Sequence, residues 1–180
     1  MSKRMFFTPE EASEAKNSLV MPRHQIDHID LKILTVLQRE ARLTNIDLSG
    51  RIGLTAPPVL RRTRTLEDAG YIRGYHASLD AKKLGFDVCA FVFVSLVSQA
   101  KNDIDAFEHM ILSWPIVREC YALTGKIDFL LKCVARNSTS FQLFITQSLM
   151  TTPNVEAVKS MLVIQTSKEA PAVPLSQHGG

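Results

Sequence analysis

Residues 55–75 read TAPPVLRRTRTLEDAGYIRGY, and this stretch decides the fold of the first part of the chain. The pattern predicts one helix over Thr55–Ala69, because a glycine follows it and prolines stand in its first turn. At 100° per residue, Val59, Thr63 and Leu66 point the same way, into an expected core. The opposite side carries Pro57, Pro58, Arg61, Arg64 and Thr65, with Arg62 at the border.

Two shorter helices are expected before this one. The first begins near Asp27 and places apolar residues on one face. The second begins at Thr44, with Asp47 three residues later as a capping partner, and ends at Gly53. After the third helix, Tyr71–Ala77 has a strand pattern with a glycine turn signal. Three short helices followed by a hairpin are typical of a winged helix-turn-helix.

From Phe86 onward the pattern changes to strands alternating with helices. Phe86 to Val97 is almost wholly apolar and predicts a strand buried on both faces. The further elements expected are a helix at 103–114, strands at 117–124 and 127–135 joined by a tight turn at Gly125–Lys126, a helix at 138–150 and a strand at 155–165. The order βαββαβ predicts a ferredoxin-like sandwich, so the fold class expected is α+β.

The chain therefore divides into five expected parts. They are an N-terminal extension at 1–26, a winged helix-turn-helix domain at 27–79, a linker at 80–85, a ferredoxin-like domain at 86–168 and a disordered tail at 169–180. Within the extension, Thr8-Pro9-Glu10-Glu11 has the pattern of a helix start, and a short helix to about Leu19 is expected.

Composition excludes several classes of protein. The 180 residues are 46% apolar and 22% charged, which is ordinary for a globular chain. No stretch has the roughly 20 apolar residues of a membrane span, and the start is too short for a signal peptide, so a cytoplasmic protein with no membrane partner is expected. The three cysteines have no paired spacing and fit free buried thiols. Residues 27–85 carry ten basic and seven acidic residues, the excess that a DNA-binding part needs.

Catalytic and metal-binding patterns are missing from the sequence. The five histidines have no metal-ligand spacing, and there is neither a glycine-rich phosphate loop nor a G-x-S-x-G stretch. No catalytic residue, metal ligand or cofactor is therefore expected, and the chain is not expected to be an enzyme.

The basic helix face suggests DNA. Arginine pairs with guanine edges or phosphates, and apolar groups contact thymine methyls in the major groove. If the third helix lies in the major groove, Thr44 and Asn45, at the start of the second helix, would lie near the DNA backbone. The alternative for Arg61–Arg64 is a merely solvated helix face.

Three motifs together resemble one protein family. Ile29–Leu34, Leu48–Leu54 and Val59–Tyr75 look like the Lrp/AsnC (leucine-responsive/asparagine-responsive, feast/famine) bacterial regulators, and the resemblance covers Asp27 to Lys168. It implies a DNA-binding domain followed by an αβ sandwich that oligomerises and, in many members, binds an amino acid. The third helix then corresponds to the recognition helix. The candidate DNA contacts are Thr44, Asn45, Thr55, Pro57, Pro58, Arg61, Arg62, Arg64 and Thr65.

The resemblance also implies an effector site. The turn Leu123–Phe129 matches the Gly-x-x-Asp loop of the family, near which amino-acid ligands lie between dimers. The candidate effector residues are Thr124, Gly125, Lys126, Asp128, Ser138 and Met161. Lys126 stands where an acidic residue is common, so it is a candidate to hold a carboxylate. The alternative is that Gly125 and Asp128 only build a structural turn.

A homodimer is expected from the strand at 86–97, because a sandwich with helices on one side would leave its second apolar face in water. A second copy of the same sheet is the simplest cover, and the resemblance implies that dimers assemble into tetramers or octamers. The function expected is a sequence-specific transcription regulator whose oligomer responds to an amino acid or a related metabolite. One alternative is an architectural DNA-binding protein without sequence preference or effector. Another is an enzyme similar to the decarboxylases of the sirohaem pathway.

Overall fold

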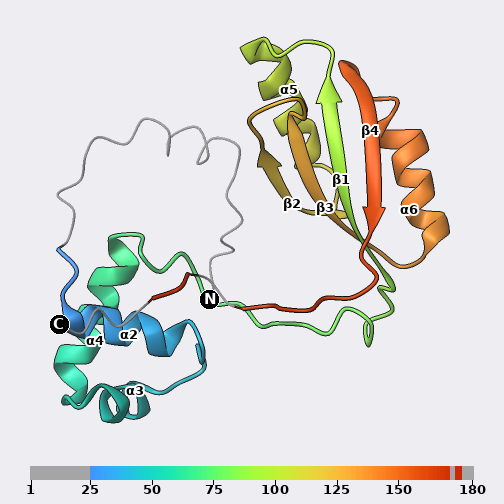
Figure 1. Cartoon of the computed structure of the whole chain (residues 1–180). Coiled ribbons are helices and arrows are strands. Elements are labelled where there is room, and N and C mark those ends of the chain that lie inside the picture. The colour runs from blue at the N-terminus through green and yellow to red at the C-terminus, as the bar shows by residue number, and fades with distance from the viewer. Residues whose placement is uncertain (1–24, 171–172, 176–180) are drawn as a thin grey trace. The chain divides into compact units, whose positions relative to one another are not determined.

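The computed structural model describes residues 25–170 and 173–175, which form two compact units (Figure 1). The second unit spans Leu79–Ser167, and the first contains the described residues on either side of it. The expected N-terminal helix and most of the expected disordered tail lie outside the described residues.

The first unit is built from three short helices. They are α2 (His28–Leu37), α3 (Asn45–Ile52) and α4 (Ala56–Asp68). Asp27 and Thr44 form capping boxes at the starts of α2 and α3, and Gly53 ends α3 in the left-handed conformation that favours glycine, at φ 81°. Their shared core contains Ile33, Leu37, Leu48, Ile52, Val59 and Leu66.

The orientation predicted for α4 is confirmed. Val59 and Leu66 are completely buried, and Thr63 is buried with them. The hydroxyl of Thr63 donates to the carbonyl oxygen of Val59 at 2.9 Å, so this polar side chain is accommodated within its own helix. Pro57, Arg61 and Arg64 lie on the exposed side.

The strand predicted at Tyr71–Ala77 is wrong. This segment is irregular and mostly exposed, and it pairs with no other segment among the described residues. A short β-ribbon needs a partner ladder to be stable, and local sequence pattern does not supply one. The segment is instead attached through Tyr75, whose hydroxyl donates to Glu67 at 2.8 Å. Burial, and then this bond to Glu67, raise the pKa of Tyr75.

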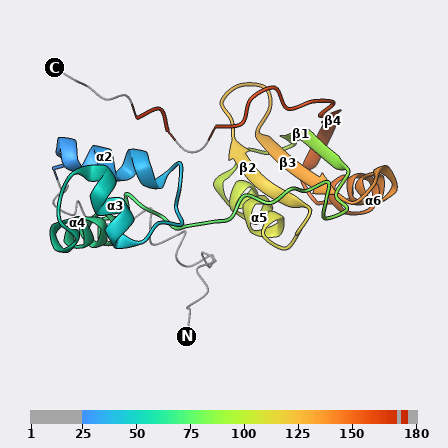
Figure 2. The same ribbon diagram turned by 90° about the horizontal axis from the view of Figure 1, so that it is seen from below.

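The second unit is the predicted βαββαβ sandwich. Its elements are β1 (Val88–Leu96), α5 (Lys101–Ile111), β2 (Val117–Ala122), β3 (Phe129–Ala135), α6 (Ser138–Phe144), the π-helical turn η1 (Ile145–Leu149) and β4 (Val155–Leu162). The sheet is antiparallel in the order β2-β3-β1-β4. Helices α5 and α6 cover one face of it (Figure 2).

The two faces of the sheet differ sharply. Alternate residues of the central strands β1 and β3 are buried beneath the helices, namely Ala90, Val92, Val94, Leu96, Phe129, Leu131, Cys133 and Ala135. The residues between them, such as Phe91, point to the face without helices. Of the two apolar faces predicted for this strand, one is buried beneath the helices, and the other is only partly covered within one chain.

Two local predictions need correction. The helix over 138–150 contains the turn η1, in which Met150 N–H donates to the Ile145 carbonyl oxygen. Of Ser148 and Leu149, which were both expected on the inward face, only Leu149 is completely buried. The tight turn expected at Gly125–Lys126 is a six-residue loop over 123–128, closed by Leu123 N–H donating to the Asp128 carbonyl oxygen at 2.8 Å.

Candidate nucleic-acid interface and effector loop

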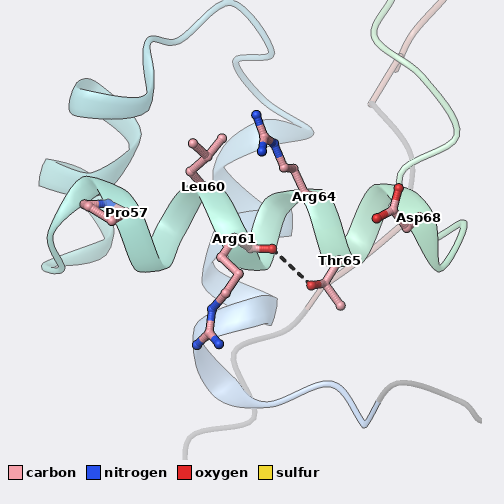
Figure 3. A pocket seen from close by; sticks show the side chains of 6 residues that line it. All are labelled: Pro57, Leu60, Arg61, Arg64, Thr65 and Asp68. Atoms are coloured by element: carbon pink, nitrogen blue, oxygen red, sulfur yellow. Dashed lines mark hydrogen bonds between the residues drawn. The ribbon is translucent and has the colours of Figure 1, made fainter.

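The exposed side of α4 forms a shallow hollow of about 410 Å³. It is lined by Pro57, Leu60, Arg61, Arg64, Thr65 and Asp68, which lie along one stripe of the helix (Figure 3). Four of these residues were predicted as DNA contacts. Leu60 and Asp68 were not, although the same 3–4 residue spacing that selects Pro57 and Arg64 also selects them.

Arg61 and Arg64 present unpaired positive charge on this stripe. Both side chains are exposed, and neither makes an ion pair with another described residue. From this stripe their side chains extend in opposite directions, across the helix axis (Figure 3). The hydroxyl of Thr65 donates to the Arg61 carbonyl oxygen at 3.0 Å, so Thr65 is held close to the helix backbone. Two unpaired guanidinium groups on one exposed helix face can bind phosphates or guanine edges.

Arg62 lies elsewhere. Its Nη1 donates to Asp27 Oδ2 at 2.7 Å and to Asp30 Oδ1 at 2.8 Å, and the Asp30 side chain is only 1% exposed. The Asp30 backbone N–H, followed by Arg62, holds the pKa of Asp27 below its ordinary value. Arg62 therefore joins α4 to the start of α2, and the structure does not place it with the other predicted DNA contacts.

At the start of α3, Thr44 and Asp47 form hydrogen bonds with each other. The hydroxyl of Thr44 donates to Asp47 Oδ2 at 2.6 Å and accepts from the Asp47 backbone N–H at 3.1 Å. The hydroxyl of Thr44 is thus occupied, and the carboxylate of Asp47 adds negative charge at this helix end. Asn45 is exposed beside them.

The start of α4 has no such cap. Thr55 occupies the capping position, but its side chain makes no capping hydrogen bond. A capping side chain accepts from the backbone N–H of the second or third helical residue. Those residues are Pro57 and Pro58, and proline has no N–H. Pro57 is exposed and Pro58 is half-buried.

In the second unit, Asp128 anchors the loop at 123–128 to the end of β1. Its Oδ2 accepts from the Leu96 backbone N–H at 2.7 Å, and its Oδ1 accepts from Gln99 Nε2 at 2.8 Å. Gly125 has φ 115°, a conformation that favours glycine, and Lys126 is exposed without an ion pair among the described residues. The carboxylate of Asp128 therefore already has a structural role.

The six candidate effector residues do not meet within one chain. Thr124, Gly125, Lys126 and Asp128 belong to the loop before β3. Ser138 begins α6 after the far end of that strand, and seven residues of strand span roughly 20 Å. Met161 lies near the end of the edge strand β4, on the open sheet face, paired with Phe91.

The open sheet face also carries a cluster of Lys132, Glu119 and Tyr121, which the sequence pattern did not predict. Lys132 Nζ lies 2.8 Å from Glu119 Oε1, and the Tyr121 hydroxyl donates to Glu119 Oε2 at 2.6 Å. Lys132, and then Tyr121, lower the pKa of Glu119. The contact between Lys132 and Glu119 could have been predicted only from the register of β2 and β3, which the sequence does not show.

The remaining polar groups give little support for catalysis. Cys133 is completely buried, and burial is the main cause that raises its pKa to about 12, which disfavours the reactive thiolate. Within the described part of the chain, no three histidine, cysteine, aspartate or glutamate side chains are placed to hold a metal ion. None of the helices in residues 25–170 and 173–175 has the length and apolar character needed to cross a bilayer.

Comparison with known proteins gives the same division of the chain. The model of the Lrp/AsnC ligand binding domain matches residues 89–173, and that of a winged helix-turn-helix DNA-binding domain matches residues 26–73. The leucine-responsive regulatory protein of Rhizobium meliloti is 49% identical over 148 residues, which are 82% of this chain and 95% of that protein. The Bkd operon transcriptional regulator of Pseudomonas aeruginosa is 38% identical over 151 residues, 84% of this chain and 99% of that protein.

A solved structure agrees as well. A transcriptional regulator from Neisseria meningitidis, in complex with L-Met, superimposes with a TM-score of 0.80 at 37% identity. The match covers 84% of this chain and 97% of that one.

Proposed function

The chain belongs to the Lrp/AsnC family of DNA-binding transcription regulators, and we propose that it reads its operator with the exposed face of α4 and responds to an amino acid bound by its second unit. The observation that carries the DNA part is the pair of unpaired arginines, Arg61 and Arg64, on that face. Within α4 Arg62 is paired with Asp27 and Asp30, and in α3 Arg51 is paired with Glu40, at 2.6 to 2.8 Å. Arg39, Arg42 and Arg73 also make no ion pair with a described residue, but they lie outside α4. Two uncompensated guanidinium groups on an exposed helix face are free to bind an anionic partner, and the phosphates and guanine edges of DNA are such partners.

The proposed contacts are fewer than those expected. Thr44, whose hydroxyl is occupied by Asp47, the capping-position residue Thr55 and the half-buried Pro58 are not proposed as contacts. Pro57, Arg61, Arg64 and Thr65 lie on the proposed contact face, and Asn45 flanks it as a candidate contact to the DNA backbone. We leave Arg62 out of the set, because its guanidinium is engaged by Asp27 and Asp30.

The proposed functional form is a homodimer that assembles further to a tetramer or an octamer. Support comes from the open sheet face, where Phe91, Tyr121 and Met161 are 37%, 49% and 47% exposed in one chain. Exposed aromatic and apolar side chains on a single face mark an interaction surface. A two-fold dimer would present two α4 helices to the two halves of a palindromic site.

For the effector, the support is the L-Met bound by the regulator from Neisseria meningitidis and the loop at 123–128. Lys126 is proposed to bind the carboxylate of an amino acid. Because Ser138 and Met161 lie away from this loop within one chain, a second chain has to supply them if they contribute to the same site.

Fluorescence anisotropy tests this function. DNA from upstream of the protein's own gene and a scrambled duplex are titrated at one salt concentration, each with and without a panel of amino acids. We expect the native fragment to bind at least 100-fold more tightly, and one amino acid to change that affinity.

Equal binding to both duplexes, unchanged by every amino acid, would contradict the proposal and favour the architectural alternative. The relatives reported above are all named as regulators, so their names give that alternative no support.

A further inference from the structure

The first turn of α4 differs from the first turns of α2 and α3. Those two helices begin with complete capping boxes and an acidic residue, Asp30 and Asp47 respectively. Helix α4 has neither a capping hydrogen bond nor an acidic residue in its first turn. Its second and third helical residues are both prolines, and Pro57 is exposed.

This construction makes the tip of α4 a poor site for phosphate. A helix N-terminus binds a phosphate through the unpaired N–H groups of its first turn. Prolines at two of these positions remove the N–H groups that would point at an oxygen. The tip is thus better suited to contact with apolar groups than with the sugar-phosphate backbone.

The hollow on α4 extends this apolar surface. Pro57 and the half-buried Leu60 line its N-terminal part, and Arg61 and Arg64 flank it (Figure 3). An exposed proline and a leucine, no more than two turns before two cations that attract DNA, place apolar atoms where the major groove would present base edges (Figure 3). The 5-methyl group of thymine is the apolar group that the major groove offers.

We infer that Pro57 and Leu60 are specificity-determining residues that recognise the 5-methyl group of a thymine in each half-site of the operator. This inference rests on the proposed function, because it requires α4 to lie in the major groove. It goes further in naming the base and the chemical group that this part of the helix selects.

Replacement of thymine by deoxyuridine tests the inference directly, because it removes the methyl group and leaves the hydrogen-bonding edge of the base unchanged. An operator is first selected from random duplexes with the full-length protein. Each thymine of a half-site is then replaced by deoxyuridine, one at a time, and affinities are measured by anisotropy. We expect one or two positions at which the replacement weakens binding about fourfold, the effect of losing one buried methyl contact.

Two matched variants assign the effect to the side chain. Pro57→Ser removes the exposed apolar ring, and Pro58→Ser removes the neighbouring, half-buried ring from the same turn. At the sensitive thymine, we expect Pro57→Ser to bind the thymine and deoxyuridine duplexes equally, whereas Pro58→Ser keeps the fourfold difference. Thermal unfolding of both variants shows whether either substitution disturbs the fold.

The outcomes separate this inference from the function on which it rests. Selective binding to an operator with no deoxyuridine effect in the wild-type protein would overturn the inference and leave the proposed function intact. A deoxyuridine effect that persists in Pro57→Ser and disappears in Pro58→Ser would also overturn it. Failure to select any preferred duplex would contradict the proposed function itself.

Discussion

Three nearly adjacent arginines in α4 have different roles. Arg61 and Arg64 are exposed and unpaired among the described residues, whereas Arg62 binds Asp27 and Asp30. Helical periodicity placed Arg62 at the border of the exposed side of α4, but it could not predict its ion-pair partners. Its partners are 35 and 32 residues away in the sequence, so only the folded chain shows them.

Arg62→Met tests the role assigned to Arg62. The substitution leaves the buried carboxylate of Asp30 without its guanidinium partner, and we expect the free energy of unfolding at pH 7 to fall by about 3 kcal/mol. The measurement is chemical denaturation. Arg51→Ala is the control, because its ion pair with Glu40 is about half exposed and contributes under about 1 kcal/mol.

The cost of Arg62→Met depends on pH. The pKa of Asp27 is lowered in the folded state from an ordinary value of 3.8, so the stability linked to it is present above about pH 4 and is lost as the pH falls through the lowered pKa. The difference between wild type and Arg62→Met is therefore expected to shrink when denaturation is repeated near pH 3. A difference that stays the same at both pH values would contradict the ion-pair account.

At the scale of elements, the features that depend on residues adjacent in the sequence were predictable. The cap at Thr44 and the end at Gly53 are local, and the structure confirms them; the capping box at Asp27 is equally local but was not predicted. The prediction of a strand at Tyr71–Ala77 was wrong, because a strand needs a partner strand and the local sequence pattern does not reveal one. The π-helical turn η1 was missed for a related reason: packing of Leu149 into the core, rather than local propensity, selects it.

The loop at 123–128 provides a test at this scale. Asp128→Ala removes the acceptor for the Leu96 N–H and for Gln99, and we expect the unfolding free energy to fall by about 1–2 kcal/mol without any ligand present. Hydrogen exchange at the Leu96 amide should become faster. Lys126→Ala is the control in the same loop and is expected to leave both values unchanged. An unchanged Leu96 exchange rate in Asp128→Ala would contradict the anchoring role.

At the scale of the whole molecule, the sequence predicted the order of both parts and the need to cover the second face of β1. It could not predict the Lys132–Glu119–Tyr121 cluster on that face, which depends on cross-strand register. The family resemblance also grouped Ser138 and Met161 with the loop at 123–128, although the sheet separates them in one chain.

Phe91→Glu tests whether the open sheet face holds the oligomer together. The new carboxylate would lie across from Lys132, whose ammonium already binds Glu119, and it would lose its water on association, so we expect monomers in sedimentation-velocity experiments and weaker binding to a palindromic operator. Leu112→Glu is the matched control, because Leu112 is 65% exposed and follows α5, on the helix-covered side. If Phe91→Glu sediments like the wild-type oligomer, the proposed dimer face is wrong.

The central claim is that α4 reads the operator with Arg61 and Arg64, and one comparison tests it most directly. The double variant Arg61→Ala/Arg64→Ala is titrated against the selected operator and a scrambled duplex. Lys83→Ala/Lys101→Ala serves as the control, since it removes two exposed charges that already have acidic partners in the second unit. We predict a loss of operator affinity of about 30-fold or more for the arginine variant, from two contacts of about 1–3 kcal/mol each, against less than about threefold for the control. Wild-type affinity and selectivity in the arginine variant would contradict the account.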